Sequence, residues 1–219
     1  EHLWGTYNTF GKWAELYVLR HRQLGTAESV VAGGRLMVPL KRKFKLTLEP
    51  VTERVKRGTL TSGEGAFVST LARKVGAVDV SAEFKHASSG FDQMYPAAHD
   101  KIGHEDLFAW RNLNNARALA TWRPAQVKGL AVNAMYNANW LVDPRVGVFS
   151  TQNRLIYRDT KGTAGHWAGQ EFDGFVNWTY RKFMTMGGGV GAYANGTFFR
   201  ATSPNRRPVF VYIHHTITL

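Results

Sequence analysis

Lys and Arg are the side chains with the clearest chemical potential in this sequence. They number 28 against 16 Asp and Glu, which gives a formal net charge of +12. Such an excess favours an anionic partner, and nucleic acid is the first class to test. The cations are spread along the whole chain, however, and the sequence holds no Gly-rich phosphate-binding loop. We therefore expect no nucleic-acid partner and look for elements that could arrange these cations around another anion.

His and Asp could supply a second kind of chemistry, because an Asp/His pair can activate water for hydrolysis. The candidates in or beside the long links between segments are His86, His99, His104 and His166, with Asp92, Asp100 and Asp106. The spacing of His99 and His104 fits no standard metal-ligand pattern, and the chain has no Cys for a thiolate site or a disulfide. We expect a protein that is not an enzyme and has no cofactor or metal. A hydrolase and a metal site in these loops are the weaker alternatives.

Alternation of apolar and polar residues with a period of two is the main structural signal. Within residues 170–180, Phe172 and Val176 share one face, and Glu171 and Asp173 share the other. Ten segments alternate in this way, and they lie at 9–22, 29–41, 43–57, 64–75, 78–88, 110–123, 127–141, 167–181, 183–196 and 208–219. Such long alternating segments predict β-strands.

The connections between these segments alternate in length. Tight turns lie at 41–43, 74–77, 124–126 and 181–182, and longer links lie at 23–28, 58–63, 89–109, 142–166 and 197–207. Long strands with short turns at one end and long loops at the other are typical of a transmembrane β-barrel. A soluble sandwich or lipocalin-like barrel alternates equally, but Trp and Tyr near the segment ends fit the aromatic girdles of a membrane barrel. We predict an all-β fold, an antiparallel up-and-down transmembrane β-barrel with about ten strands, formed by residues 1–219 as one domain.

Strand parity places the polar side chains on one common face, the lumen of the predicted barrel. Its cations are Arg35, Lys45, Lys85, Arg111, Arg117, Arg123 and Arg181, and its carboxylates are Glu15, Glu49, Glu83, Glu171 and Asp173. Rings of cations select anions in pores, and interleaved carboxylates would hold those cations as ordered ion pairs. Each residue therefore has two interpretations, a place on an anion pathway or a structural ion pair. The turn cations at 41–43 fit attraction to membrane-surface phosphates instead.

The link at 89–109 is unusually apolar for a loop in water. Its distinctive residues are Phe91, Asp92, Tyr95, Pro96, His99 and Phe108. A loop of this composition could fold into the barrel mouth as a gate, or it could cap neighbouring loops. Both interpretations stay open.

A sequence block within this link resembles a known family. Residues 91–99, Phe-Asp-Gln-Met-Tyr-Pro-Ala-Ala-His, and 106–113, Asp-Leu-Phe-Ala-Trp-Arg-Asn-Leu, look like a block of the alginate-export outer-membrane barrels. Residues 169–173, Gly-Gln-Glu-Phe-Asp, are similar to a strand start in that family. The resemblance implies an export pore for an anionic polysaccharide of the alginate type in the outer membrane of a Gram-negative bacterium. It also implies contact with membrane lipid and lipopolysaccharide, and with periplasmic or outer-membrane partner proteins.

The length of the chain departs from that family, whose members are much longer and form wider barrels. The chain is therefore expected to be either the C-terminal half of a larger barrel or a small barrel of the same lineage. Barrels of about eight strands are filled by side chains, and open channels occur at about 16–18 strands. A closed barrel of about ten strands would pass small ions rather than a hydrated polymer. The alternative function is a structural or partner-bound outer-membrane barrel without transport.

Overall fold

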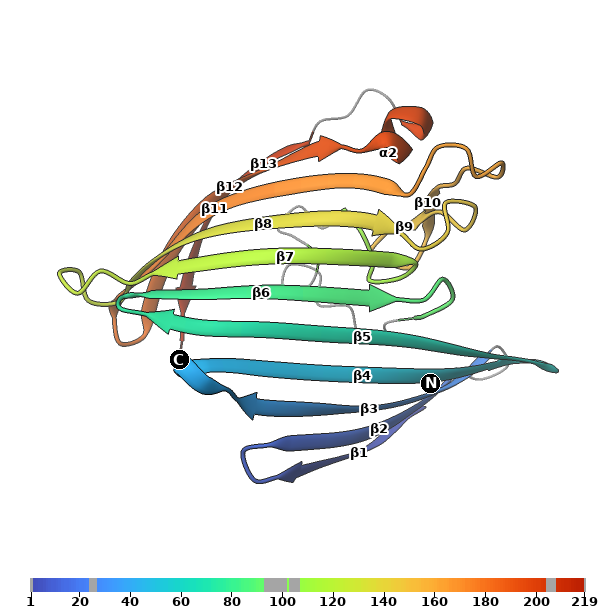
Figure 1. Cartoon of the computed structure of the whole chain (residues 1–219), viewed down its shortest axis with the longest axis horizontal. Coiled ribbons are helices and arrows are strands. Elements are labelled where there is room, and N and C mark those ends of the chain that lie inside the picture. Colours follow the sequence, from blue (N-terminus) through green and yellow to red (C-terminus); the bar gives the residue numbers. More distant parts are fainter. Residues whose placement is uncertain (1, 24–26, 93–101, 103–106, 204–207, 219) are drawn as a thin grey trace.

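A single large antiparallel sheet dominates the computed structural model, which describes residues 2–23, 27–92, 102, 107–203 and 208–218 (Figure 1). The sheet has eleven strands that follow one another in chain order. They are β1 (His2–Phe10), β2 (Ala14–Gln23), β3 (Ala27–Pro39), β4 (Phe44–Arg57), β5 (Leu60–Val75), β6 (Val78–Ala87), β7 (Leu113–Trp122), β8 (Leu130–Leu141), β11 (Trp167–Arg181), β12 (Met184–Asn195) and β13 (Val209–Ile217). The predicted all-β, antiparallel, up-and-down architecture is confirmed.

Smaller elements join these strands. A short hairpin of β9 (Val148–Phe149) and β10 (Leu155–Tyr157) forms a separate sheet in the connection from β8 to β11, so β8 pairs with β11. The 3-10 helix η1 (Lys41–Lys43) joins β3 to β4, and the helix α2 (Thr197–Thr202) follows β12. None of the helices in the described residues has the length and apolar character needed to cross a membrane. Strands β1 and β13 form the two edges of the described sheet.

The predicted segment 9–22 covers the end of β1, a turn and β2, and β1 begins before it at His2, so the sheet has eleven strands and not ten. Strand β1 ends at Phe10, and β2 begins at Ala14, which is paired with Phe10. Gly11 turns the chain at a φ of +58°, a conformation that glycine adopts without steric cost. The turn keeps Phe10 and Ala14 on the same face, so the alternation passes through it unbroken. Periodicity alone therefore gives no sign of this turn.

The expected loop at 58–63 is also much shorter in the structure. Strand β4 continues to Arg57 and β5 begins at Leu60, and these two residues pair across a tight turn. Gly58 adopts a φ of +59° in that turn. The resulting β4–β5 hairpin projects beyond the neighbouring strands at the end of the sheet that carries the long connections (Figure 1).

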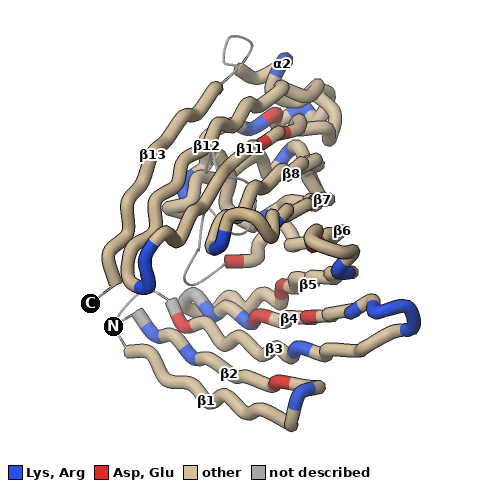
Figure 2. Tube along the Cα trace, turned by 90° about the vertical axis from the view of Figure 1, so that its left-hand side faces the viewer, with Lys and Arg blue, Asp and Glu red and all other residues tan. Residues whose placement is uncertain are grey.

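The two faces of the sheet differ sharply in polarity. On one face large apolar side chains are exposed, as in Phe172 at 56% and Ile213 at 88%. On the other face charged side chains are buried, as in Lys85 and Glu171, each at 1%. The sheet curves around this polar face, which we call the inner face (Figure 2). An exposed apolar surface of this extent fits hydrocarbon, whereas a soluble sheet would bury it.

An apolar cluster covers the inner face at the end that bears the long connections. Its members from the loops and α2 are Phe91, Ile102, Phe108, Trp110, Val148, Ala164, Phe198 and Phe199. They pack against small and apolar side chains of the strands, including Ala66, Leu113 and Leu141. The long connections thus fold back onto the sheet at this end.

Candidate functional site

The inner face of β2, β3 and β4 carries an ion-pair network around Arg35. The guanidinium nitrogens lie 2.9 Å from Glu15 Oε2 and 3.0 Å from Glu49 Oε2. Glu49 also accepts a hydrogen bond of 3.0 Å from the Tyr17 hydroxyl. Strand register explains the network, because Glu15 and Arg35 are direct cross-strand partners. The Arg35 side chain is 39% exposed, so an incoming anion can reach it.

A second network lies on β5, β6 and β7 and centres on Glu83. Lys85 Nζ lies 2.6 Å and an Arg117 guanidinium nitrogen 2.8 Å from Glu83 Oε1. The Thr70 hydroxyl donates to the other carboxylate oxygen over 3.0 Å. The Lys85 side chain is only 1% exposed and that of Arg117 17%. Buried charges need close partners, so this network is a fixed structural unit.

Amides and carboxylates occupy the inner face beyond β7. Asn115 on β7 donates hydrogen bonds to the side-chain oxygens of Asn139 at 2.9 Å and Asn137 at 3.3 Å, both on β8. Glu171 and Asp173 follow on β11, buried to 1% and 5% exposure. The predicted lumen carboxylates therefore lie on the inner face, next to a ladder of asparagines that parity reasoning had not singled out.

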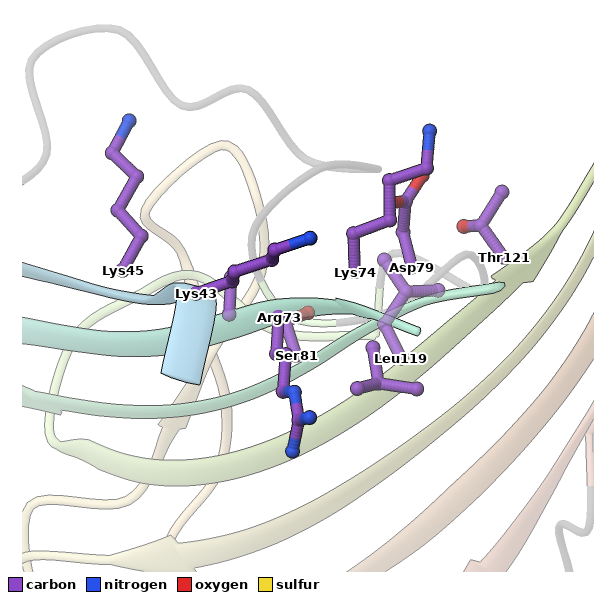
Figure 3. Close-up of a pocket in the computed structure, with 10 residues that line it drawn as sticks. Lys43, Lys45, Arg73, Lys74, Asp79, Ser81, Leu119 and Thr121 are labelled. Atoms are coloured by element: carbon purple, nitrogen blue, oxygen red, sulfur yellow. The ribbon is translucent and has the colours of Figure 1, made fainter. Parts of the chain in front are cut away.

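A basic recess of about 310 Å³ lies where the inner face meets the short turns. Lys45 and Lys74 rise from one side of the sheet, with Lys43 beside them, whereas Arg73 points to the other side (Figure 3). The Arg73 guanidinium lies 5.0 Å from the ring centroid of Phe44 on that opposite face. We use "basic recess" for the site of Lys43, Lys45 and Lys74. Asp79 also lines the recess, so three ammonium groups face one carboxylate, and the remaining positive charge attracts anions.

The three remaining predicted lumen cations lie at strand ends or beyond. Arg111 precedes β7, stacks 4.0 Å from the Phe149 ring centroid and donates to the Ser89 carbonyl over 3.1 Å. Asn112, at a φ of +52°, breaks the alternation between Arg111 and the strand. Arg123 follows β7 and pairs with Asp79, and Arg181 is the last residue of β11. Only Arg111 is separated from its strand by a break in the alternation, whereas the partner of Arg123, Asp79, lines the basic recess on the inner face.

The predicted gating loop is fixed to the sheet where the structure describes it. Phe91 packs edge-on against Trp110 at a centroid distance of 5.4 Å, and Phe108 lies 5.7 Å from Phe199 of α2. Phe91 and Phe108 are both 3% exposed. The other predicted members, Tyr95, Pro96 and His99, lie outside the described residues.

Two carboxylates hold the start of this loop. Glu53 Oε2 on β4 accepts the backbone N–H of Asp92 over 2.8 Å. Glu64 Oε2 on β5 accepts the Ser88 hydroxyl over 2.6 Å and the backbone N–H of Gly90 over 3.1 Å. The sheet thus binds the loop through its backbone, whatever side chains the loop carries.

The connection from β8 to β11 has its own carboxylate anchor. Asp159 accepts backbone N–H groups from Ala164 at 2.7 Å and Lys161 at 3.0 Å. These hydrogen bonds stabilise the ionised form and lower the pKa of the Asp159 carboxyl. They also hold Ala164 in the apolar cluster, so the second long connection folds inward like the first.

The histidines considered for hydrolysis have other neighbours in the described residues. His86 Nδ1 lies 2.7 Å from Asn114 Oδ1, and His166 Nδ1 lies 2.9 Å from the carbonyl oxygen of Leu141. The backbone of Asp92 is bound by Glu53. His99, Asp100, His104 and Asp106 lie outside the described residues.

Sequence reasoning missed two functional features of the inner face. Lys74 shares parity with Ala66, Val68 and Ala72, so the alternation of its segment could have placed it beside Lys45. The loop-anchoring role of Glu53 left no local signal, because its partner Asp92 lies 39 residues away.

Comparison with solved structures identifies the fold. OprD, an outer membrane protein from Pseudomonas aeruginosa, matches with a TM-score of 0.63 at 11% identity, over 98% of this chain and 58% of that one. OpdO from Pseudomonas aeruginosa matches with a TM-score of 0.62 at 12% identity, over 99% and 55%. OccAB2 from Acinetobacter baumannii matches with a TM-score of 0.61 at 10% identity, over 97% and 53%. The chain thus spans little more than half the length of each.

The sequence comparison is more specific about the family. No curated protein matches the chain significantly. Residues 82–212 match the alginate export family, which confirms the resemblance carried by the block at 91–113. Together with the barrel fold, this match places the protein in the outer membrane of a Gram-negative bacterium, where its apolar outer face contacts lipid. The chain belongs to the alginate export family.

Proposed function

We propose that the inner face of this chain lines an outer-membrane pore for anionic solutes, an acidic polysaccharide of the alginate type among them. The basic recess carries this proposal. Lys43, Lys45 and Lys74 gather at the end of the inner face that bears the short turns. Short turns face the periplasm in outer-membrane barrels, so the recess lies where an exported anion would enter.

The Arg35 network farther along the inner face suits passage of an anion rather than tight binding. Arg35 is held between Glu15 and Glu49, yet its side chain stays 39% exposed. A carboxylate of the passing anion can replace one of these partners with little change in energy. Conduction requires sites that are favourable enough to enter and weak enough to leave, and shared cations provide them.

The apolar cluster at the opposite end supports a constriction. Phe91, Phe108 and Phe199 cover the inner face there, and the backbone of the first long connection is bound to Glu53 and Glu64. We propose that these loops narrow the external mouth, which is the gating role predicted for Phe91, Asp92 and Phe108.

Two neighbouring residues on opposite faces allow a matched test. Lys74→Glu combined with Lys45→Glu reverses charge in the basic recess, whereas Arg73→Glu makes the same kind of change one residue away on the outer side. We expect the double variant to lose anion preference, measured as the reversal potential in planar bilayers under a KCl gradient. The Arg73→Glu variant should keep it.

Equal reversal potentials for the wild type and the double variant would contradict the anion pathway. A folded protein without any conductance would instead favour a structural or partner-bound barrel. Heat-modifiable migration on gels reports folding of each variant independently of conductance.

A further inference from the structure

The outer face of β2, β3 and β4 changes character along the strands. From the short-turn end, the outward residues of β4 begin with Phe44, Leu46 and Leu48, and the series ends in Arg54 and Lys56. These cations are exposed, while the alternate residues Glu53 and Val55 are buried on the inner face. The same outer surface therefore turns from apolar to cationic toward the end with the long connections.

Strand β2 repeats this change, and the register aligns the two sets. Its outward residues include Leu16 and Val18 and end in Arg20 and Arg22. Arg20 pairs with Val30 on β3, which pairs with Arg54 on β4. One step farther, Arg22 pairs with Glu28, which pairs with Lys56. The cations thus form two adjacent rows across three strands, and we call Arg20, Arg22, Arg54 and Lys56 the outer basic patch.

One carboxylate lies within this patch and orients it. Glu28 Oε1 is 2.8 Å from a guanidinium nitrogen of Arg20 and accepts a second hydrogen bond from Arg20 Nε at 2.9 Å. The Arg20 side chain remains 51% exposed. Glu28 offsets only one of the four positive charges, so the patch keeps a positive surplus.

The position of the patch along β4 matches the boundary between the apolar part of a membrane and its headgroups. At about 3.4 Å per residue and a strand tilt of about 40°, residues 44 to 52 of β4 cover about 21 Å, close to the apolar band of about 25 Å in such barrels. Arg54 and Lys56 follow this stretch directly. They lie at the end with the long connections, which faces the cell exterior in outer-membrane barrels.

We propose that the outer basic patch binds the phosphorylated headgroup of lipopolysaccharide in the outer leaflet. Contact with lipid follows from the location of the protein, but a defined site requires fixed cations at headgroup depth, and β2 and β4 provide them. By strand spacing and rise, the patch measures about 10 by 7 Å, which suits a headgroup with more than one phosphate better than a single phosphate ion. Arg is well suited to phosphate because its planar donors bind two oxygens at once.

The neighbouring strands show that these cations are a local feature. The last outward residues at the same end of β6, β7 and β8 are His86, Asn114 and Trp140, which lie in one cross-strand row. Aromatic and amide side chains suit a general membrane interface. The outward cations are therefore confined to β2 and β4, and a bound headgroup would lie on the outer surface of these strands.

Binding of purified lipid A to the detergent-solubilised protein, followed by native mass spectrometry, tests this site. The variant Arg20→Gln/Arg22→Gln/Arg54→Gln/Lys56→Gln should lose at least about tenfold in affinity, because each cation at an anionic lipid surface contributes to binding. The matched control Lys12→Gln/Lys128→Gln/Lys182→Gln removes exposed cations beside the short turns at the opposite end and should bind as the wild type does. The charge-retaining variant Arg20→Lys/Arg22→Lys/Arg54→Lys should keep most of the affinity.

Two further ligands separate the headgroup from its alternatives. Dephosphorylated lipid A should bind the wild type as weakly as lipid A binds the glutamine variant. Unchanged lipid A affinity in a folded glutamine variant would overturn the proposal, as would inorganic phosphate binding as tightly as lipid A. Because these measurements need no conductance, their outcome is independent of the pore proposed above.

Discussion

At the scale of single residues, the ion pairs of this sheet belong to two environments. Glu83 holds Lys85 and Arg117 at 2.6 and 2.8 Å, with side-chain exposures of 1% and 17%. Glu28 holds Arg20 at a similar distance of 2.8 Å, but the Arg20 side chain is 51% exposed. The two ion pairs have similar distances but contribute differently to stability, because solvent screens the charges of the Glu28–Arg20 pair.

This contrast gives a prediction about stability. Glu83→Gln removes the carboxylate from a buried lysine, and we expect a loss of about 3–5 kcal/mol in the free energy of unfolding. Glu28→Gln breaks the exposed pair and should cost about 1 kcal/mol or less. Urea unfolding in detergent, followed by tryptophan fluorescence, measures both. Similar losses for the two variants would show that the inner face is as well hydrated as the outer patch.

At the scale of elements, the sequence predicts the strands well because each strand has one apolar and one polar face. Parity correctly separates Phe172 from Glu171, and the positions of Arg35, Lys85 and Arg117 follow from it. It fails where the backbone leaves the regular strand conformation. Gly11 turns the chain without changing parity, and Asn112 changes parity before a strand begins. Long-range anchors such as Glu53 to Asp92 have no periodic signature at all.

Strand β11 contains one such irregularity within the family motif at 169–173. The register shifts between Trp167 and Gly169, and Gly169 has a φ of +144°. A Cβ at this position would also collide with the carbonyl oxygen of Ala194 on the neighbouring strand. The glycine of the motif is therefore required by the backbone, and the irregularity lets β11 enter the sheet beside the apolar cluster.

Replacing this glycine should be costly. We expect Gly169→Ala to lower the free energy of unfolding by about 1–3 kcal/mol, because alanine is strained at this φ. Gly174→Ala is the matched control in the same strand, since a Cβ there meets nothing within 4 Å. Thermal melting in detergent compares the two variants. A Gly169→Ala protein as stable as the control would mean that the strand start relaxes into a regular register.

At the scale of the whole molecule, charge and topology act together. The cations behind the formal charge of +12 include those of the basic recess, the ion pairs of the inner face and the outer basic patch. A pore requires a closed wall, whereas β1 and β13 are both edges of the described sheet. The chain covers little more than half the length of the solved barrels that it resembles.

The salt dependence of ion selectivity is the prediction that tests this molecule-wide picture. The screening length is about 10 Å at 0.1 M salt and about 3 Å at 1 M, so the field of the basic recess reaches across a lumen only at low salt. We expect a clear anion preference in dilute KCl that fades as the concentration rises toward 1 M, measured by reversal potentials at a fixed concentration ratio. In the Lys45→Glu/Lys74→Glu variant the preference should be weak at every concentration. A preference that persists undiminished at 1 M would point to direct ion binding at a narrow constriction, formed by the apolar cluster and its loops, instead of a diffuse field from the recess.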